Sequence, residues 1–417
     1  MKPEHIKRWL ILPFSLSAIS LVTFCNTPLQ TTAHPHPTPT PQPTRHPRPT
    51  PPPRPTSTPS ASPVPTPSPT PSLTPQPTST PTATPTTTPL PSPSPAPSST
   101  NWSAPTNYPP YSWTPYAPSP NSVWNTPFQT NPSSPDPNGS TYTATYSKYN
   151  WFTQAITFGY ASESNQYQHP IYFGYASDPV YKIKCTASWA SQCPKTSFHI
   201  PSYAVPAGGS DAHLTSIDYT YSPAQELDCW STNTPSGTGG TLTAQACGAG
   251  PLSGTGLTFG QTGAGYAQWA GIIRAQELIA GQINHALFMV TPCSSNSSVY
   301  PSQTRTSDAY CAGGAPYGAR LRLNMTPAQI AALSVPSYHK TILLAASTYG
   351  VYMGDNNNTG LNFQTEADEM YTAAGTPNPL VAWAKANGVP FNGTSYQIDI
   401  SGDVPVSAWQ WLLPPSH

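Results

Sequence analysis

Three neighbouring segments, HLTSIDYTY (residues 213–221), ELDCWS (226–231) and TLTAQA (241–246), decide the fold class of this chain. Each is rich in the residue types that favour strands. Short turns separate them, and the turn over residues 236–240 is rich in glycine. The three segments therefore predict three neighbouring β-strands.

Strand-forming sequence continues on both sides of these segments. We expect further strands at Thr141–Tyr146, Trp151–Tyr160, Pro170–Tyr175, Val180–Cys185, His285–Thr291, Gly318–Leu323 and Gly350–Gly354. Helices are expected at a few places only, namely Gln268–Ala280, Ala328–Leu333, Ser337–Tyr349 and Leu380–Asn387. The pattern predicts one mainly β domain over residues 121–413, a β-sandwich or jelly roll with a few short peripheral helices.

Six cysteines lie in this domain, and an even number in an exported chain predicts disulfides. Six cysteines allow fifteen pairings. We favour the pairing of sequence neighbours, which joins Cys185 to Cys193, Cys229 to Cys247 and Cys293 to Cys311. A zinc site is disfavoured because no pair has Cys-x-x-Cys spacing.

The first 120 residues carry signals for export and for a spacer. A basic start, an apolar stretch over residues 9–24 and a polar region ending at Ala33 predict a secretory signal peptide over residues 1–33. An uncleaved anchor and lipid attachment at Cys25 are the alternatives. Residues 34–120 are predicted to be a disordered linker, since 26 of residues 34–100 are proline, mixed with Thr and Ser. We therefore expect a secreted or cell-surface protein with no membrane span after signal cleavage.

Charge is scarce in this chain and unevenly divided. Only 8% of the 417 residues are Asp, Glu, Lys or Arg, against about 25% in an ordinary soluble domain. The net charge of zero combines +5 over residues 1–100 with −5 over the remainder. Without a basic surplus we expect no nucleic-acid partner. Separately, we expect the protein to be a monomer. Carboxylates set in apolar strand sequence become the best candidates for a site.

Glu226 and Asp228 are the first candidates for chemistry. They stand two apart, so on a strand both side chains project from one face, with Trp230 next on that face. Two carboxylates beside an indole suit glycoside cleavage, in which one acid protonates the leaving oxygen and the other is nucleophile or base. The close like charges would also separate the two pKa values. The alternative is a surface strand with two solvated acids.

A second group of candidates combines histidines with acids. Asp211 and His213 would project together from a strand, where the carboxylate can hold a histidine tautomer. Arg274 and Glu277 stand three apart on an expected helix, so they would either pair in a salt bridge or supply a catalytic Glu277. His285 begins an apolar strand. A structural hydrogen bond in the core is the alternative for each histidine.

Three weaker candidates complete the set. Arg305 and Tyr352 are expected to bind substrate, the tyrosine by stacking on a sugar ring. The same substrate-binding role is expected of Asp211, Trp230 and Arg274. Asp355 lies in a Gly-Asp-Asn-Asn-Asn stretch that is most simply a turn. Its oxygens could hold a structural Ca²⁺, although EF-hand spacing is absent. We expect no other cofactor or metal.

Two family resemblances bear on these residues. Glu226-Leu-Asp resembles the start of the Glu-x-Asp-x-(x)-Glu strand of laminarinase-type glycoside hydrolases, but Trp230 and Ser231 stand where the second Glu would be. Gly209-Ser-Asp-Ala-His-Leu, Glu226-Leu-Asp-Cys-Trp and Arg274-Ala-Gln-Glu with Asn284-His-Ala-Leu resemble a group of exported bacterial domains of unsettled activity, over about residues 120–390. That resemblance implies one constellation made of Asp211, His213, Asp228, Trp230, Arg274, Glu277 and His285.

These observations lead to one main expectation. We expect a secreted glycoside hydrolase that acts on an extracellular polysaccharide, with Glu226, Asp228 and Glu277 as acid, nucleophile or base, positioned by His213 and His285. The alternatives are a non-catalytic cell-wall or polysaccharide-binding module on a stalk, a polysaccharide lyase and a metal-dependent enzyme. Convergence of the candidates in one cleft would favour an enzyme, whereas scattered candidates with an aromatic strip would favour binding.

Overall fold

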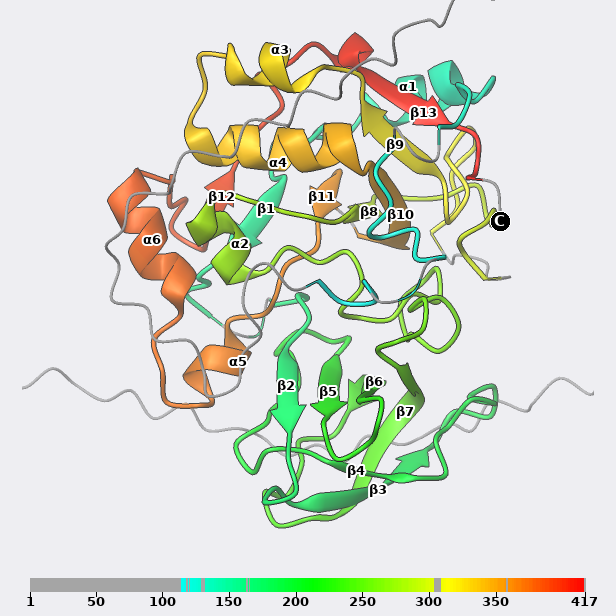
Figure 1. The fold of residues 1–417 in the computed structure, drawn as a ribbon, viewed down its shortest axis with the longest axis vertical. Helices are drawn as coiled ribbons and strands as arrows, with labels where there is room; N and C mark the ends of the chain where they lie inside the picture. The colour runs from blue at the N-terminus through cyan, green and yellow to red at the C-terminus, as the bar shows by residue number, and fades with distance from the viewer. Residues whose placement is uncertain are drawn as a thin grey trace, which may run out of the picture. The chain divides into compact units, whose positions relative to one another are not determined.

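A six-stranded sheet is built around the three segments that decide the fold class. The computed structural model describes residues 114–117, 119, 121–128, 132–162, 164, 166–303, 309–357 and 359–415. In it β5 (Leu214–Asp218), β6 (Gln225–Thr232) and β7 (Gly240–Pro251) are consecutive antiparallel neighbours. β2 (Ile171–Gly174) pairs in parallel with β5, β3 (Val180–Cys185) pairs in parallel with β7, and β4 (Ser197–His199) completes the edge. Figure 1 shows this sheet in the lower half of the view.

A five-stranded sheet occupies the upper half of the same view (Figure 1). Its order is β11-β8-β10-β9-β13, and β8 and β10 are its parallel pair. The strands are β8 (Leu287–Thr291), β9 (Arg320–Leu323), β10 (Val351–Asn356), β11 (Asn362–Phe363) and β13 (Trp409–Leu412). A separate antiparallel pair joins β1 (Ile156–Phe158) to β12 (Tyr396–Ile398).

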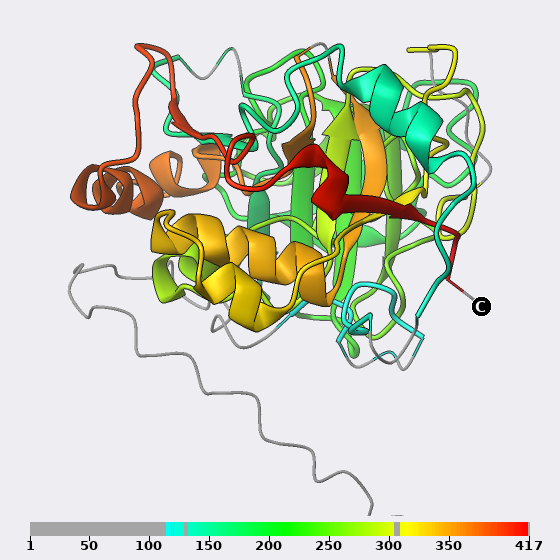
Figure 2. The same ribbon diagram turned by 90° about the horizontal axis from the view of Figure 1, so that it is seen from above.

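Short helices accompany the five-stranded sheet. They are α1 (Gly139–Tyr146), α2 (Ala275–Ala280), α3 (Pro327–Ala331), α4 (Ser337–Thr348), α5 (Glu369–Thr372) and α6 (Pro379–Asn387), with a 3₁₀ turn η2 (Val406–Ala408). Figure 2 shows α3 and α4 on one side of the sheet and α1 on the other. No helix among the described residues has the length and apolar character needed to cross a membrane.

The mainly β class and the three disulfides are confirmed. Each cysteine is bonded to its sequence neighbour, with bonds Cys185–Cys193, Cys229–Cys247 and Cys293–Cys311. The sandwich or jelly-roll topology is not confirmed. A jelly roll is antiparallel throughout, whereas both large sheets here contain parallel pairs.

The expected strand at Thr141–Tyr146 is wrong, because these residues form most of α1. Tyr142, Thr145 and Tyr146 are its buried residues, a spacing that fits one face of a helix. The ring of Tyr142 packs edge-on against Trp411 of β13 at 5.5 Å. Packing of the rings against the sheet therefore overrides the strand preference of Thr and Tyr.

The expected helix over Gln268–Ala280 begins only at Ala275, because residues 266–274 instead link the two large sheets. We call these nine residues the linking segment. On one side, the backbone N–H groups of Gln268 and Trp269 donate to side chains of β6. On the other side, Phe288 N–H of β8 donates to the carbonyl of Gly271 at 2.7 Å. Gly271 has a φ of +73°, and a Cβ there would lie 2.6 Å from the Trp124 ring, so only glycine fits.

Packing of the domain begins before the boundary expected at residue 120. Tyr116 is fully buried and donates a hydrogen bond from its hydroxyl to Glu226 Oε2. The predicted signal peptide and the linker up to residue 113 lie outside the described residues.

Candidate functional site

The carboxylates of Glu226 and Asp228 lie on one face of β6, as the strand spacing predicts, but both are fully buried. Glu226 Oε1 accepts from the N–H of Trp269 at 3.0 Å, and Asp228 Oδ2 accepts from the N–H of Gln268 at 2.7 Å. The hydroxyl of Thr215 in β5 donates to Gln268 Oε1 at 2.6 Å and lies 3.2 Å from Asp228 Oδ1. The pair therefore fixes the linking segment onto the six-stranded sheet.

Burial and mutual repulsion set the protonation of this pair. Burial, and then the negative charge of Glu226, raise the pKa of Asp228 well above its usual value of 3.8. Burial also raises the pKa of Glu226, while hydrogen bonds from Asp228, Tyr116 and Trp269 oppose that rise. Asp228 is therefore the protonated member of the pair, and its carboxyl O–H donates a hydrogen bond to Glu226.

Two histidines extend this buried network. His213 Nδ1 lies 2.6 Å from the side-chain nitrogen of Gln268, and His169 Nδ1 donates to the carbonyl of Gln268 at 2.7 Å. The two imidazole rings are 4.8 Å apart. Burial lowers the pKa of His213 to about 4, and burial together with His213 lowers the pKa of His169 to about 3. Both rings are therefore neutral at neutral pH.

Arg274, Glu277 and His285 form a second buried group, at the start of α2. Arg274 Nη2 donates to Glu277 Oε1 at 2.8 Å, which confirms the expected salt bridge. His285 Nε2 lies 3.1 Å from Glu277 Oε2, and His285 Nδ1 lies 2.8 Å from the carbonyl of Ala286. Burial favours the neutral acid, but the charges of Arg274 and His285 outweigh it and lower the pKa of Glu277 to about 2. Glu277 is therefore an ionised partner of two donors.

The remaining candidates make other contacts. Asp211 accepts from the indole N–H of Trp230 at 3.2 Å. Tyr352 is buried in the core, where it packs edge-on against Trp124 at 5.6 Å. Arg305 lies outside the described residues. The sequence candidates thus fall into separate bonded groups, and the catalytic candidates among them are all buried.

Sequence reasoning missed a histidine–aspartate pair at the end of β5. Asp218 is fully buried, and His199 Nδ1 lies 3.0 Å from Asp218 Oδ2. Asp218 also accepts from the backbone N–H groups of His199 and Thr220 and from the Thr220 hydroxyl. Four donors to one carboxylate fasten β4 across the end of β5. No local spacing indicates this pair, because 19 residues separate its members.

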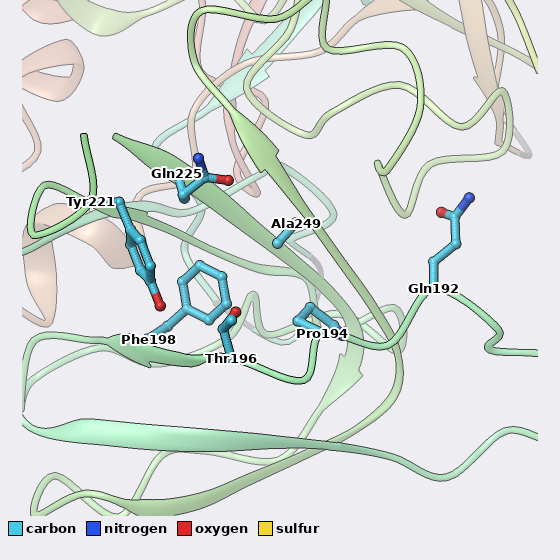
Figure 3. A pocket seen from close by; sticks show the side chains of 7 residues that line it. All are labelled: Gln192, Pro194, Thr196, Phe198, Tyr221, Gln225 and Ala249. Carbon is cyan, nitrogen blue, oxygen red and sulfur yellow. The ribbon is translucent and has the colours of Figure 1, made fainter. Parts of the chain in front are cut away.

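A pocket of about 360 Å³ lies against the six-stranded sheet (Figure 3). Its lining residues are uncharged and consist of Gln192, Pro194, Thr196, Phe198, Tyr221, Gln225 and Ala249. Phe198 and Tyr221 place their rings side by side, with centroids 5.6 Å apart. Gln225 neighbours Glu226 on β6, so it projects from the face opposite the buried carboxylates. Four lining residues come from positions 192–198, where no expected element drew attention to them.

Metal-binding geometry is not found in the described part of the chain, where no group of three or more His, Cys, Asp or Glu side chains could hold a metal ion. Asp355 accepts from the N–H groups of Gly263 and Asn356, each at 2.8 Å. Asp355 lies in strand β10 and not in the expected turn, and its carboxylate therefore binds the backbone at residue 263 to that strand.

No protein-family model, curated protein or solved structure matches this chain.

Proposed function

We propose that this protein is an extracellular polysaccharide-binding module that holds neutral sugars against its six-stranded sheet. The observation that carries the proposal is the uncharged pocket (Figure 3). Sugars present apolar C–H faces to aromatic rings and hydroxyl groups to amides. The pocket offers the half-buried ring of Tyr221, backed by the buried ring of Phe198, together with the amides of Gln192 and Gln225.

The lining matches a neutral ligand better than a charged one. A uronate or phosphate would need Arg or Lys for charge-assisted hydrogen bonds, and the seven lining residues include neither. Tyr221 is also held in place, because its hydroxyl donates to the carbonyl of Ser197 at 2.6 Å. A fixed ring loses little freedom when a sugar packs on it.

Export to an oxidising compartment accompanies this proposal. Three disulfides are typical of secreted and cell-surface proteins. The proline-rich sequence over residues 34–100 would then act as a stalk between the cell and the module.

Tyr221→Ala is expected to weaken polysaccharide binding about tenfold, because the variant removes half of the ring pair. Binding is measured by retardation of the purified protein in native gels that contain laminarin, arabinoxylan, galactomannan or hydroxyethylcellulose. Gln225→Ala should weaken binding through loss of an amide. Tyr310→Ala removes an aromatic ring that is 63% exposed in a different loop, and it serves as the matched control. A wild-type protein that no polysaccharide retards would contradict the proposed function.

Glycoside hydrolysis is a second candidate, favoured by one specific observation. A glycosidase needs a carboxyl group that stays protonated at neutral pH, and the pKa of Asp228 is raised by burial and by Glu226. Hydrolysis would also need the linking segment to move, because Gln268 and Trp269 cover both carboxylates.

A reducing-sugar assay over the same four polysaccharides tests this candidate. If the carboxylate pair is catalytic, turnover should fall by at least about a hundredfold in Asp228→Asn, since the acid proton is lost. Asp399→Asn, a surface change, is the control. Equal turnover in wild type and Asp228→Asn would remove the pair from any mechanism.

A further inference from the structure

We infer that Trp189, supported by Trp230, is a second sugar-stacking subsite for the same class of polysaccharide as the pocket. The inference rests on the proposed function and extends it to a second place on the sheet. It begins from the exposure of Trp189, whose side chain is 60% accessible to solvent. A single exposed ring is common on protein surfaces, so the pairing of Trp189 with a second ring is what marks this position.

Trp189 is held in a defined position. It lies in the loop closed by the Cys185–Cys193 disulfide. The N–H groups of Thr186 and Ala187 in this loop donate to the carbonyls of Ala244 and Gln245 in β7, each at 3.0 Å. The loop is therefore fixed to the sheet at its base, and the indole is presented to solvent on a rigid support.

Trp230 forms the base of this subsite. Its ring lies 6.0 Å from that of Trp189, at an angle of 44°. Trp230 is half-buried, and its indole N–H is fixed by Asp211. The two rings thus form an angled aromatic corner, with one member anchored and the other accessible.

Backbone strain surrounds the same corner. Ala212 and Ser231 have φ values of +41° and +51°, in a region that residues other than glycine seldom adopt. Two backbone hydrogen bonds connect the two strained positions. Ser231 N–H donates to Asp211 O at 2.7 Å, and Thr232 N–H donates to Ala212 O at 3.1 Å. Strain of this kind concentrates where a side chain must be placed accurately for binding. Here it orients Asp211 and Trp230.

Polar groups beside the corner suit sugar hydroxyls. Gln245 is exposed, and its amide donates to the Ser231 hydroxyl at 3.1 Å. The loop that carries Trp189 also supplies Gln192 to the pocket. One rigid loop therefore contributes to both places. Gln225 and Trp230 project from opposite faces of β6, so the two places are separate subsites for the same class of polysaccharide.

The test measures binding and protection in the same samples. Trp189→Ala should bind the best of the four gel polysaccharides about tenfold more weakly, whereas Trp189→Phe, which keeps a ring, should lose less than about threefold. In the wild type, that polysaccharide should protect Trp189 from oxidation by N-bromosuccinimide, as located by mass spectrometry of the peptide. An unchanged thermal unfolding midpoint in Trp189→Ala would show that the fold is kept.

The outcomes separate this inference from the proposed function. Weaker binding in Tyr221→Ala, with full binding and no protection at Trp189, would overturn the second subsite and leave the pocket. Weaker binding in Trp189→Ala with full binding in Tyr221→Ala would support the subsite and overturn the pocket. A wild-type protein that none of the four polysaccharides retards would overturn both.

Discussion

Glu277→Gln should destabilise the protein by about 3–5 kcal/mol, the cost of breaking a buried ion pair by removing one partner. Glu277 accepts from Arg274 and contacts His285, and all three side chains are buried. The amide would leave the charge of Arg274 without its counter-charge and would turn a donor group toward one of these two residues. Urea unfolding at pH 7 measures the loss.

The pH dependence of this contribution follows from the lowered pKa of Glu277. Its value of about 2 lies below the usual 4.5, so between these values the unfolded chain binds more protons than the folded one. The contribution is therefore complete above about pH 4.5 and declines as the pH falls toward 2. Burial of His169 and His213 adds its own acid sensitivity, so the informative quantity is the difference between wild type and Glu277→Gln. That difference should shrink below pH 4.5.

Asp399→Asn is the control for the loss of a carboxylate at the surface, where an effect below about 1 kcal/mol is expected. A loss of less than 1 kcal/mol in Glu277→Gln would show that the ion group contributes little to the fold.

Asp228→Ala should cost about 3 kcal/mol, because it leaves a buried backbone donor without an acceptor and removes packed atoms from the core. This donor is the N–H of Gln268, whereas the hydroxyl of Thr215 keeps Gln268 Oε1 as its acceptor at 2.6 Å. The linking segment would lose one of its hydrogen bonds to β6, while those to Glu226 and Cys229 remain. Asp228→Asn should be much milder, since its amide can accept from Gln268 and can donate toward Glu226 in place of the acid proton.

The sign of the pH effect at Asp228 is opposite to that at Glu277. Because the pKa of Asp228 is raised above 3.8, the folded state binds more protons than the unfolded state above that pH. The contribution of this group therefore decreases as the pH rises past 3.8. Urea unfolding from pH 5 to 9 should show a decline in the wild type that is smaller in Asp228→Asn. Equal slopes in the two proteins would mean that Asp228 is already ionised in the folded state.

The sequence predicted strands where short-range pattern and tertiary packing agree. β3 was expected with its exact bounds, and β5 and β6 within a few residues. The pattern failed at α1, where aromatic rings find their partners on a distant strand. It failed again at residues 268–274, whose backbone hydrogen bonds go to two sheets instead of along a helix.

In the candidate site too, contacts set by local spacing were predicted and those made by distant segments were not. Strand spacing placed Glu226 and Asp228 on one face of a strand, and helical spacing paired Arg274 with Glu277. Burial could not be predicted, because the cover over the carboxylates comes from Tyr116 and from the linking segment, which are remote in sequence. A different signal was available for Trp189. A disulfide loop with only seven residues between its cysteines is too short to bury an indole within itself, so the exposure of Trp189 could have been expected from the cysteine pairing.

The disulfides can form earlier than the sheets when the chain is made from its amino end. The sulfur atoms of each bond are separated by only 8 or 18 residues, so each bond can close once a short stretch has entered an oxidising compartment. The pairing of β1 with β12, and of β9 with β13, must wait until residues 396–412 have arrived. All three disulfides can thus be closed while the sheets still lack strands, and late arrival of residues 396–412 would leave a fully oxidised but incompletely folded protein.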